Sequence, residues 1–77
     1  MLDKIISIVA ETLDVDRSEI KPDTDFKKDL DADSLDLFEL VEAMEDKFDF
    51  DIPNEDAEKL TTVNAIMAYM KEKGLEQ

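Results

Sequence analysis

The tetrapeptide Asp33-Ser34-Leu35-Asp36 places a serine hydroxyl at the predicted start of a helix. Free backbone N–H groups and the helix dipole at such a start stabilise negative charge, including that of a phosphate. A phosphodiester on the oxygen of Ser34 would therefore be tolerated there and would project away from the core. The same residues also suit plain capping, in which Asp33 or Ser34 accepts hydrogen bonds from those N–H groups. Capping is the commoner role of such a pair, so the tetrapeptide alone leaves both interpretations open.

The chain of 77 residues contains no His and no Cys. Without Cys it has no disulfide, no thiolate metal site and no thiol nucleophile. Without His it lacks the commonest general base and the commonest zinc ligand. A chain of this length also builds a thin core that cannot easily enclose a deep catalytic cavity. We therefore expect residues 1–77 to form a single domain that is not an enzyme.

The charge of the chain restricts its partners. Its 22 acidic and 9 basic residues give a net charge of -13. Such a surface repels nucleic acid and anionic membranes, so we expect partners with basic protein surfaces. No apolar run approaches the roughly 20 residues of a membrane span, and the first residues do not resemble a signal peptide. We expect a cytoplasmic monomer.

Apolar residues at helical spacing predict the elements that must position Ser34. A first amphipathic helix begins at Leu2 and ends around Asp14, and a second runs from about Ser34 to Asp49. Between them, residues 15–31 form a long connection held to the core by four apolar anchors: Val15, Ile20, Phe26 and Leu30.

The second half of the chain predicts two further helices. Ile52-Pro53 stops the second helix, and a short third helix begins at Asn54. Thr62 suits the cap of a fourth helix, and Gly74 suits its end. The sequence thus predicts an all-α fold without strands, a small four-helix bundle with three longer helices, a short third helix and a long first loop.

Two large apolar residues of the second helix, Leu35 and Phe38, fall among acidic residues on its outer face. The segment from Asp33 to Asp51 contains eight acids and one Lys, a net charge of -7. Isolated exposed apolar residues are common and charged faces are usually just solvated. The alternative is a docking strip, to which acidic residues attract a basic partner that the apolar contacts then hold.

A wider set of strings closely resembles the prosthetic-group site of acyl carrier proteins, in order and with the family's spacing. These strings are FKKDLDADSLD (residues 26–36), ELV (39–41), FDFDIP (48–53) and AEKLTTV (57–63). The resemblance covers essentially the whole chain and is greatest to the discrete carriers of type II fatty acid synthesis.

The resemblance implies that Ser34 carries 4'-phosphopantetheine, transferred from coenzyme A by a phosphopantetheinyl transferase, the holo-synthase. The thiol of this group would carry acyl groups as thioesters, so a chain without His or Cys needs no nucleophile of its own. The second helix would bind the enzymes of fatty acid synthesis through their basic docking patches. Five residues match recognition positions of the family: Asp33, Leu35, Asp36, Glu39 and Glu45. The exposed strip adds Phe38 and Glu42.

The chain departs from the family's pattern at two positions. The family commonly has Gly where this chain has Asp31, a residue that tolerates left-handed backbone better than most. We expect modification to persist despite this change. The family often has an apolar Met where this chain has Glu42, which makes the outer face of the second helix more acidic.

The predicted core also has a functional interpretation, although simple core packing accounts for part of it. We expect an acyl chain to enter between the second and third helices, because small Ala and flexible Met side chains make a core that can yield. Eight residues are predicted to line its path: Leu37, Val41, Met44, Ile52, Leu60, Ala65, Ile66 and Tyr69.

Other functions remain open at this point. Asp29, Asp31 and Asp33 alternate like the first ligands of a calcium-binding EF-hand loop. That loop also needs Gly and Glu where this chain has Ser34 and Leu40, so we expect no dedicated metal site. Carriers for polyketide, peptide or D-alanyl transfer share the serine-centred helix, and an unmodified acidic adaptor is a further alternative.

Overall fold

The computed structural model describes residues 2–74 and contains four α-helices and one short 3-10 helix. They are α1 (Leu2–Leu13), η1 (Arg17–Glu19), α2 (Ser34–Phe48), α3 (Asn54–Ala57) and α4 (Val63–Glu72). Within residues 2–74 there is no strand, and one isolated β-bridge pairs Asp25 with Thr62. The predicted all-α bundle with a short third helix is confirmed.

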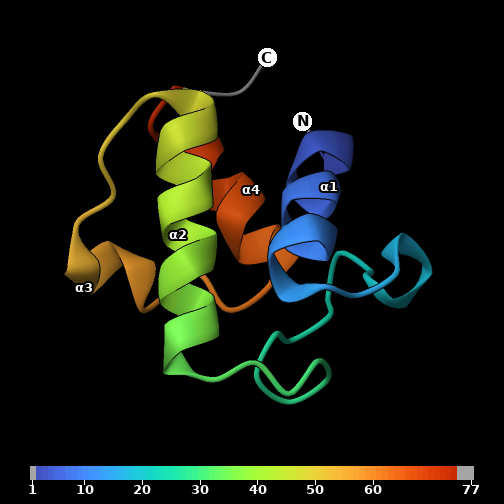
Figure 1. Cartoon of the computed structure of the whole chain (residues 1–77). Coiled ribbons are helices and arrows are strands. Elements are labelled where there is room, and N and C mark those ends of the chain that lie inside the picture. The colour runs from blue at the N-terminus through green and yellow to red at the C-terminus, as the bar shows by residue number, and fades with distance from the viewer. Residues whose placement is uncertain (1, 75–77) are drawn as a thin grey trace.

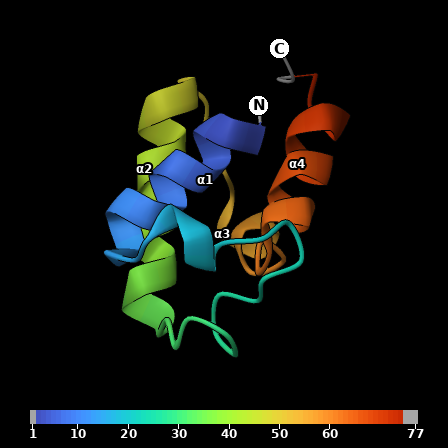
Figure 2. The same cartoon turned by 90° about the vertical axis from the view of Figure 1, so that its right-hand side faces the viewer.

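The three longer helices surround one core. α1 packs against both α2 and α4, and α3 lies on the other side of α2 from α1 (Figure 1). The view from the side shows α4 next to α1, with the long first loop passing beneath them (Figure 2). Each long helix buries residues three or four positions apart, which form one stripe on a helix. The buried residues of these stripes are Ile5, Ile8 and Val9 in α1, Leu40, Val41 and Met44 in α2, and Val63, Ile66 and Met70 in α4.

The long connection between α1 and α2 is held to this core by its predicted apolar anchors. Ile20 and Phe26 are buried, and Val15 and Leu30 pack against the core while partly exposed. The backbone N–H of Phe26 also donates to the carbonyl oxygen of Thr61 at 2.9 Å. The loop that precedes Ser34 is therefore fixed to the segment between α3 and α4.

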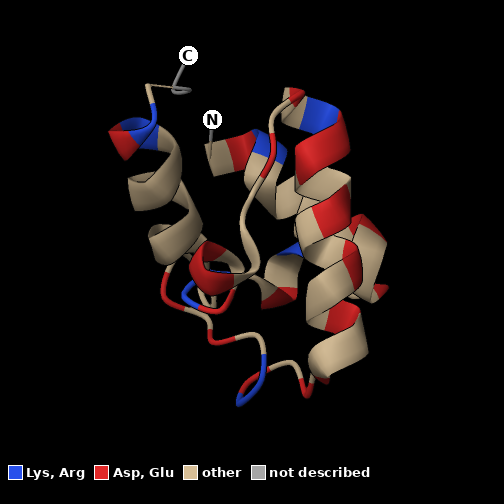
Figure 3. Cartoon of the chain, turned by 90° about the vertical axis from the view of Figure 1, so that its left-hand side faces the viewer, with Lys and Arg blue, Asp and Glu red and all other residues tan. Residues whose placement is uncertain are grey.

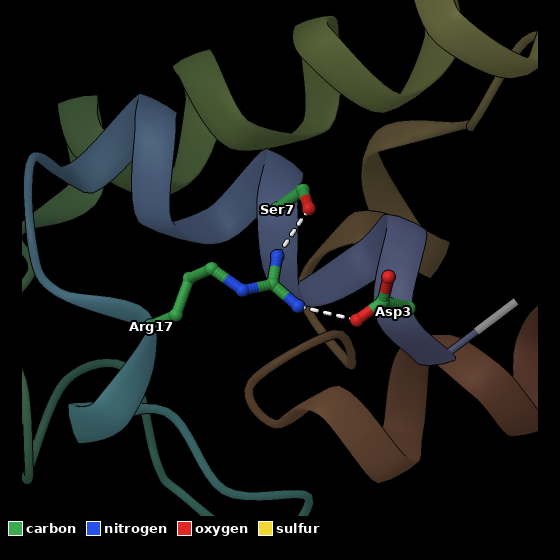
Figure 4. A network of polar contacts seen from close by, with 3 residues as sticks. All are labelled: Asp3, Ser7 and Arg17. Atoms are coloured by element: carbon green, nitrogen blue, oxygen red, sulfur yellow. Dashed lines mark hydrogen bonds and ion pairs between the residues drawn. The ribbon is translucent and has the colours of Figure 1, made fainter.

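A polar network ties the beginning of the connection to α1. The guanidinium group of Arg17 donates hydrogen bonds to the hydroxyl of Ser7 and to the carboxylate of Asp3 (Figure 4). Arg17 is the only Arg in the sequence, and it lies in the 3-10 helix η1. The network holds η1 against the exposed face of α1.

Three Asp residues and one Gly have left-handed backbone among residues 2–74. Asp14 follows α1, Asp49 forms the C-terminal cap of α2, and Asp31 precedes Ser34 by three residues. Their φ angles are 55°, 55° and 57°, and Gly74 after α4 has a φ of 73°. Only Gly adopts this conformation without steric cost, and Asp and Asn tolerate it better than other residues.

Candidate functional site

The first turn of α2 is closed by two carboxylates. The Oδ1 atom of Asp33 accepts a hydrogen bond from the backbone N–H of Asp36 at 2.9 Å. The Oδ2 atom of Asp36 accepts one from the backbone N–H of Asp33 at 3.1 Å. This reciprocal pair is a capping box, and it makes Asp33 the N-terminal cap and Ser34 the first helical residue.

Ser34 is exposed, and the cap does not use its hydroxyl. Of the two capping residues considered from the sequence, the structure uses Asp33. The hydroxyl of Ser34 is thus left at the positive end of a helix of 15 residues, where a phosphodiester is stabilised. The carboxylates of Asp33 and Asp36 oppose that effect by charge repulsion. An exposed hydroxyl at this position fits a group attached through a phosphodiester.

The backbone immediately before Ser34 is tightly constrained. Asp31, which departs from the pattern of the family that the sequence resembles, has a φ of 57° and therefore left-handed backbone. Ala32 is buried, and its N–H donates to the carbonyl oxygen of Phe26 at 2.9 Å. The buried Ala32 and Phe26 together fix the direction in which the chain enters α2.

The outer face of α2 has the predicted exposed apolar pair. Leu35 is 63% exposed and Phe38 is 56% exposed, whereas most large apolar side chains of the described residues are buried or partly buried. Acidic residues occur along the length of α2, and Lys47 near its end is the one basic residue in this helix (Figure 3). Glu39 and Glu42 are exposed beside the apolar pair. Their binding to partners stays a prediction.

Glu45, the seventh residue predicted to bind partners, has a structural contact as well. It is partly buried, and its Oε2 atom accepts a hydrogen bond from the backbone N–H of Ile52 at 2.9 Å. This bond holds the segment between α2 and α3 against α2. Asp36 is likewise partly buried because its carboxylate belongs to the cap.

The eight residues predicted to line an acyl chain lie in or beside the core. Val41, Met44, Ile52, Leu60 and Ile66 are buried. Leu37 and Tyr69 are partly buried and pack against the core, and Ala65 in α4 is partly buried too.

Two open hollows in the surface lie elsewhere. One of about 490 Å³ at the C-terminal end of α2 is lined by Glu42, Glu45, Asp46, Asp49, Phe50 and Asp51. One of about 400 Å³ between α1 and α2 is lined by Ile8, Glu11, Thr12, Glu39, Ala43, Asp46 and Lys47. None of the eight predicted residues lines either hollow.

Tyr69 forms a contact that the sequence did not predict. Its hydroxyl donates a hydrogen bond to Oδ2 of Asp56 at 2.8 Å, which joins α4 to α3. Burial of the phenol, this hydrogen bond and the negative charges of Asp56 and Glu72 raise the pKa of Tyr69 to about 12. Acidic residues at a helix start are common, so Asp56 carried no sequence signal for this role.

Two of the three carboxylates in the candidate calcium loop have other partners. Oδ2 of Asp29 accepts a hydrogen bond from the N–H of Asp25 at 2.8 Å, and Asp33 belongs to the cap of α2. Across residues 2–74, no three acidic side chains are grouped as metal ligands would be.

Comparison with known proteins identifies a family and a close relative. A family model described as the phosphopantetheine attachment site matches residues 3–70. An acyl carrier protein of Bdellovibrio bacteriovorus is 51% identical over 71 residues, which cover 92% of this chain and 91% of that relative.

Proposed function

Because the chain belongs to the acyl carrier proteins, the family with a phosphopantetheine attachment site, we propose that Ser34 is the residue to which 4'-phosphopantetheine is attached. The observation that carries this proposal is the exposed hydroxyl of Ser34 at the start of α2, which the capping carboxylates leave free for reaction. When bound, the group supplies a thiol that carries acyl chains as thioesters. The protein is thus an acyl carrier.

The constrained entry into α2 supports this assignment. The left-handed backbone at Asp31 and the buried Ala32 fix the first turn of α2 to the core. A transferase that recognises this turn therefore meets the hydroxyl of Ser34 in one orientation, which favours reaction because little conformational freedom is lost.

We further propose that the cargo is the growing chain of fatty acid synthesis. The Thr61-Thr62-Val63 segment and the heavy acidity of the chain support this pathway over polyketide, peptide or D-alanyl transfer. The acidic outer face of α2 with Leu35 and Phe38 would bind the transferase and the synthesis enzymes through their basic patches.

The remaining predictions concern the whole chain. One hydrophobic core connects all the helices from α1 to α4, which supports a single carrier domain over residues 1–77. Within residues 2–74, none of the helices is both long and apolar enough to cross a membrane. A cytoplasmic location and a monomeric state stay predictions from the sequence.

The attachment site can be tested by intact mass. The chain is incubated with coenzyme A and a broad-specificity phosphopantetheinyl transferase, and we expect the mass of one phosphopantetheine to be added. Ser34→Ala should remain unmodified, whereas Ser18→Ala, which removes another exposed serine, should be modified like the wild type. Modification of Ser34→Ala would refute the assignment.

The pathway needs a second experiment with the modified chain. The modified protein is incubated with malonyl-coenzyme A and with the malonyl transferase and condensing enzyme of a bacterial fatty acid synthase. We expect malonyl loading followed by elongation. Loading only by an enzyme that activates amino acids would favour a carrier for peptide or D-alanyl transfer instead.

A further inference from the structure

The helix α3 has few means of stabilising itself. It contains four residues, and no side chain caps its start at Pro53. An isolated helix of this length is unstable in water because too few hydrogen bonds offset the cost of nucleation. Among the described residues, α3 also lacks the extended packing that joins α1 to α2 and to α4. The position of α3 therefore depends on contacts made by the residues around it.

Two side-chain hydrogen bonds hold this part of the chain to the long helices. Glu45 of α2 accepts the N–H of Ile52, just before α3. Asp56 within α3 accepts the hydroxyl of Tyr69 from α4. The first bond fixes the segment that leads into α3, so the second is the one that holds α3 itself to a long helix.

The ring of Tyr69 is braced in the orientation that this bond requires. It stacks on Phe50, from the segment between α2 and α3, with a centroid distance of 6.4 Å and an interplanar angle of 29°. The Nζ atom of Lys73 lies 5.6 Å from the centroid of the same ring. The side chain of Tyr69 is therefore already ordered by its packing. Less conformational entropy is lost when its hydroxyl forms the hydrogen bond to Asp56.

Residues proposed to line the path of an acyl chain lie on both sides of this bond. Ile52 and Leu60 flank α3 in the sequence, and both are buried. Tyr69, in α4, donates the hydrogen bond to Asp56. An acyl chain that enters beside α3 must therefore move α3 relative to α4. This movement lengthens or breaks the hydrogen bond between Asp56 and Tyr69.

We propose that the hydrogen bond between Tyr69 and Asp56 is a latch that controls how often α3 moves away from α4. The latch sets how fast an acyl chain enters and leaves the core. The part that concerns the acyl chain rests on the proposed function. The latch itself is a property of the unmodified chain.

The latch is tested first in the unmodified chain by hydrogen exchange. The N–H groups of Ala57 and Leu60 donate to the carbonyls of Pro53 and Ala57, so their exchange reports opening of α3. Tyr69→Phe keeps the ring and removes the hydroxyl. We expect it to speed exchange at both amides about fivefold, the change that a typical hydrogen bond makes in an equilibrium.

Matched variants decide whether that effect belongs to the bond. Asp56→Ala should speed the same amides, and the double variant should add little to either single change. Glu55→Ala removes the neighbouring exposed carboxylate of α3 and should leave both amides unchanged. Amides of the α1 and α2 core should exchange alike in all variants. Unchanged exchange at Ala57 and Leu60 in Tyr69→Phe would overturn the latch.

The second experiment uses the chain modified and loaded with an octanoyl group labelled with carbon-13 at its methyl end. Relaxation dispersion of this methyl group measures how fast the octanoyl group exchanges between the core of the protein and the solvent. We expect Tyr69→Phe to raise the exchange rate about fivefold. Faster exchange of the α3 amides with unchanged methyl exchange would overturn control of the acyl chain. Failure to modify Ser34 would instead refute the proposed function and leave the hydrogen-exchange result intact.

Discussion

Asp33 and Asp36 each accept the backbone N–H of the other across the first turn of α2, at 2.9 and 3.1 Å. Ser34 lies between them in the sequence and takes no part in this exchange. The capping of α2 and the proposed attachment of the prosthetic group therefore depend on different side chains. Substitutions can therefore change the stability of α2 without removing the attachment residue Ser34, and the reverse.

We expect Asp33→Ala to lower the free energy of unfolding by about 1 kcal/mol, because the N-terminal cap of α2 is lost. Asp33→Asn should retain most of the stability because Asn also caps well. Ser34→Ala should change the free energy of unfolding by less than about 0.5 kcal/mol. Urea unfolding followed by circular dichroism measures all three. A loss in Ser34→Ala as large as that in Asp33→Ala would show that the hydroxyl belongs to the cap.

Asp31→Gly should stabilise the chain by about 0.5 kcal/mol, since Gly adopts a φ of 57° without the steric cost that Asp carries. Asp31→Ala should destabilise it, because Ala lacks the local hydrogen bonding that helps Asp in this conformation. Asp23→Gly is the control, at an exposed loop position without positive φ. It should destabilise through the greater freedom of the unfolded chain. The prediction is wrong if both Gly variants change stability in the same direction.

Tyr69 gives the stability of the chain a defined dependence on alkaline pH. Its pKa rises from 10.0 to about 12 on folding, so the folded chain holds the phenolic proton more tightly than the unfolded chain. The resulting stabilisation is fully present below pH 10 and is lost as pH rises through 12. The quantity to measure is the difference in free energy of unfolding between wild type and Tyr69→Phe, because it isolates the contribution of the phenolic hydroxyl. Urea unfolding at several pH values should show this difference shrinking above pH 10.

Leu35→Ala and Phe38→Ala should each weaken binding to a phosphopantetheinyl transferase roughly tenfold, because both side chains are exposed and available to a partner. Leu2→Ala is the matched control, since Leu2 is exposed on α1 and lies outside the docking strip. Titration calorimetry measures the affinities, and added salt should weaken binding of the wild type. Equal affinity of Phe38→Ala and wild type would remove Phe38 from the docking strip.

The sequence predicted the bundle because its determinants are local. Helical spacing of apolar residues, the cap at Thr62 and the stop at Gly74 each involve neighbours a few positions apart. The burial of Ile20 and Phe26 was also predictable, since large apolar residues are rare in an otherwise polar connection.

The unpredicted contacts join residues that only the folded chain brings together. Asp56 and Tyr69 are 13 positions apart, and Asp3 and Arg17 are 14 apart. The chain has 22 acidic residues, so no pattern identifies which one pairs with a given Tyr or Arg. The exposure of Ser34 was expected from its place at a helix start, whereas the choice of Asp33 as the cap needed the structure.

The residue that joins α4 to α3 also makes the protein its own optical reporter. Tyr69 is the one Tyr in the sequence, and there is no Trp. The intrinsic ultraviolet fluorescence of the unlabelled wild-type chain therefore arises almost entirely from this single ring. A carboxylate hydrogen-bonded to the phenol is a proton acceptor for its excited state. Emission should consequently brighten when Asp56 moves away, so that cargo-dependent movement of α3 can be followed without attaching any dye.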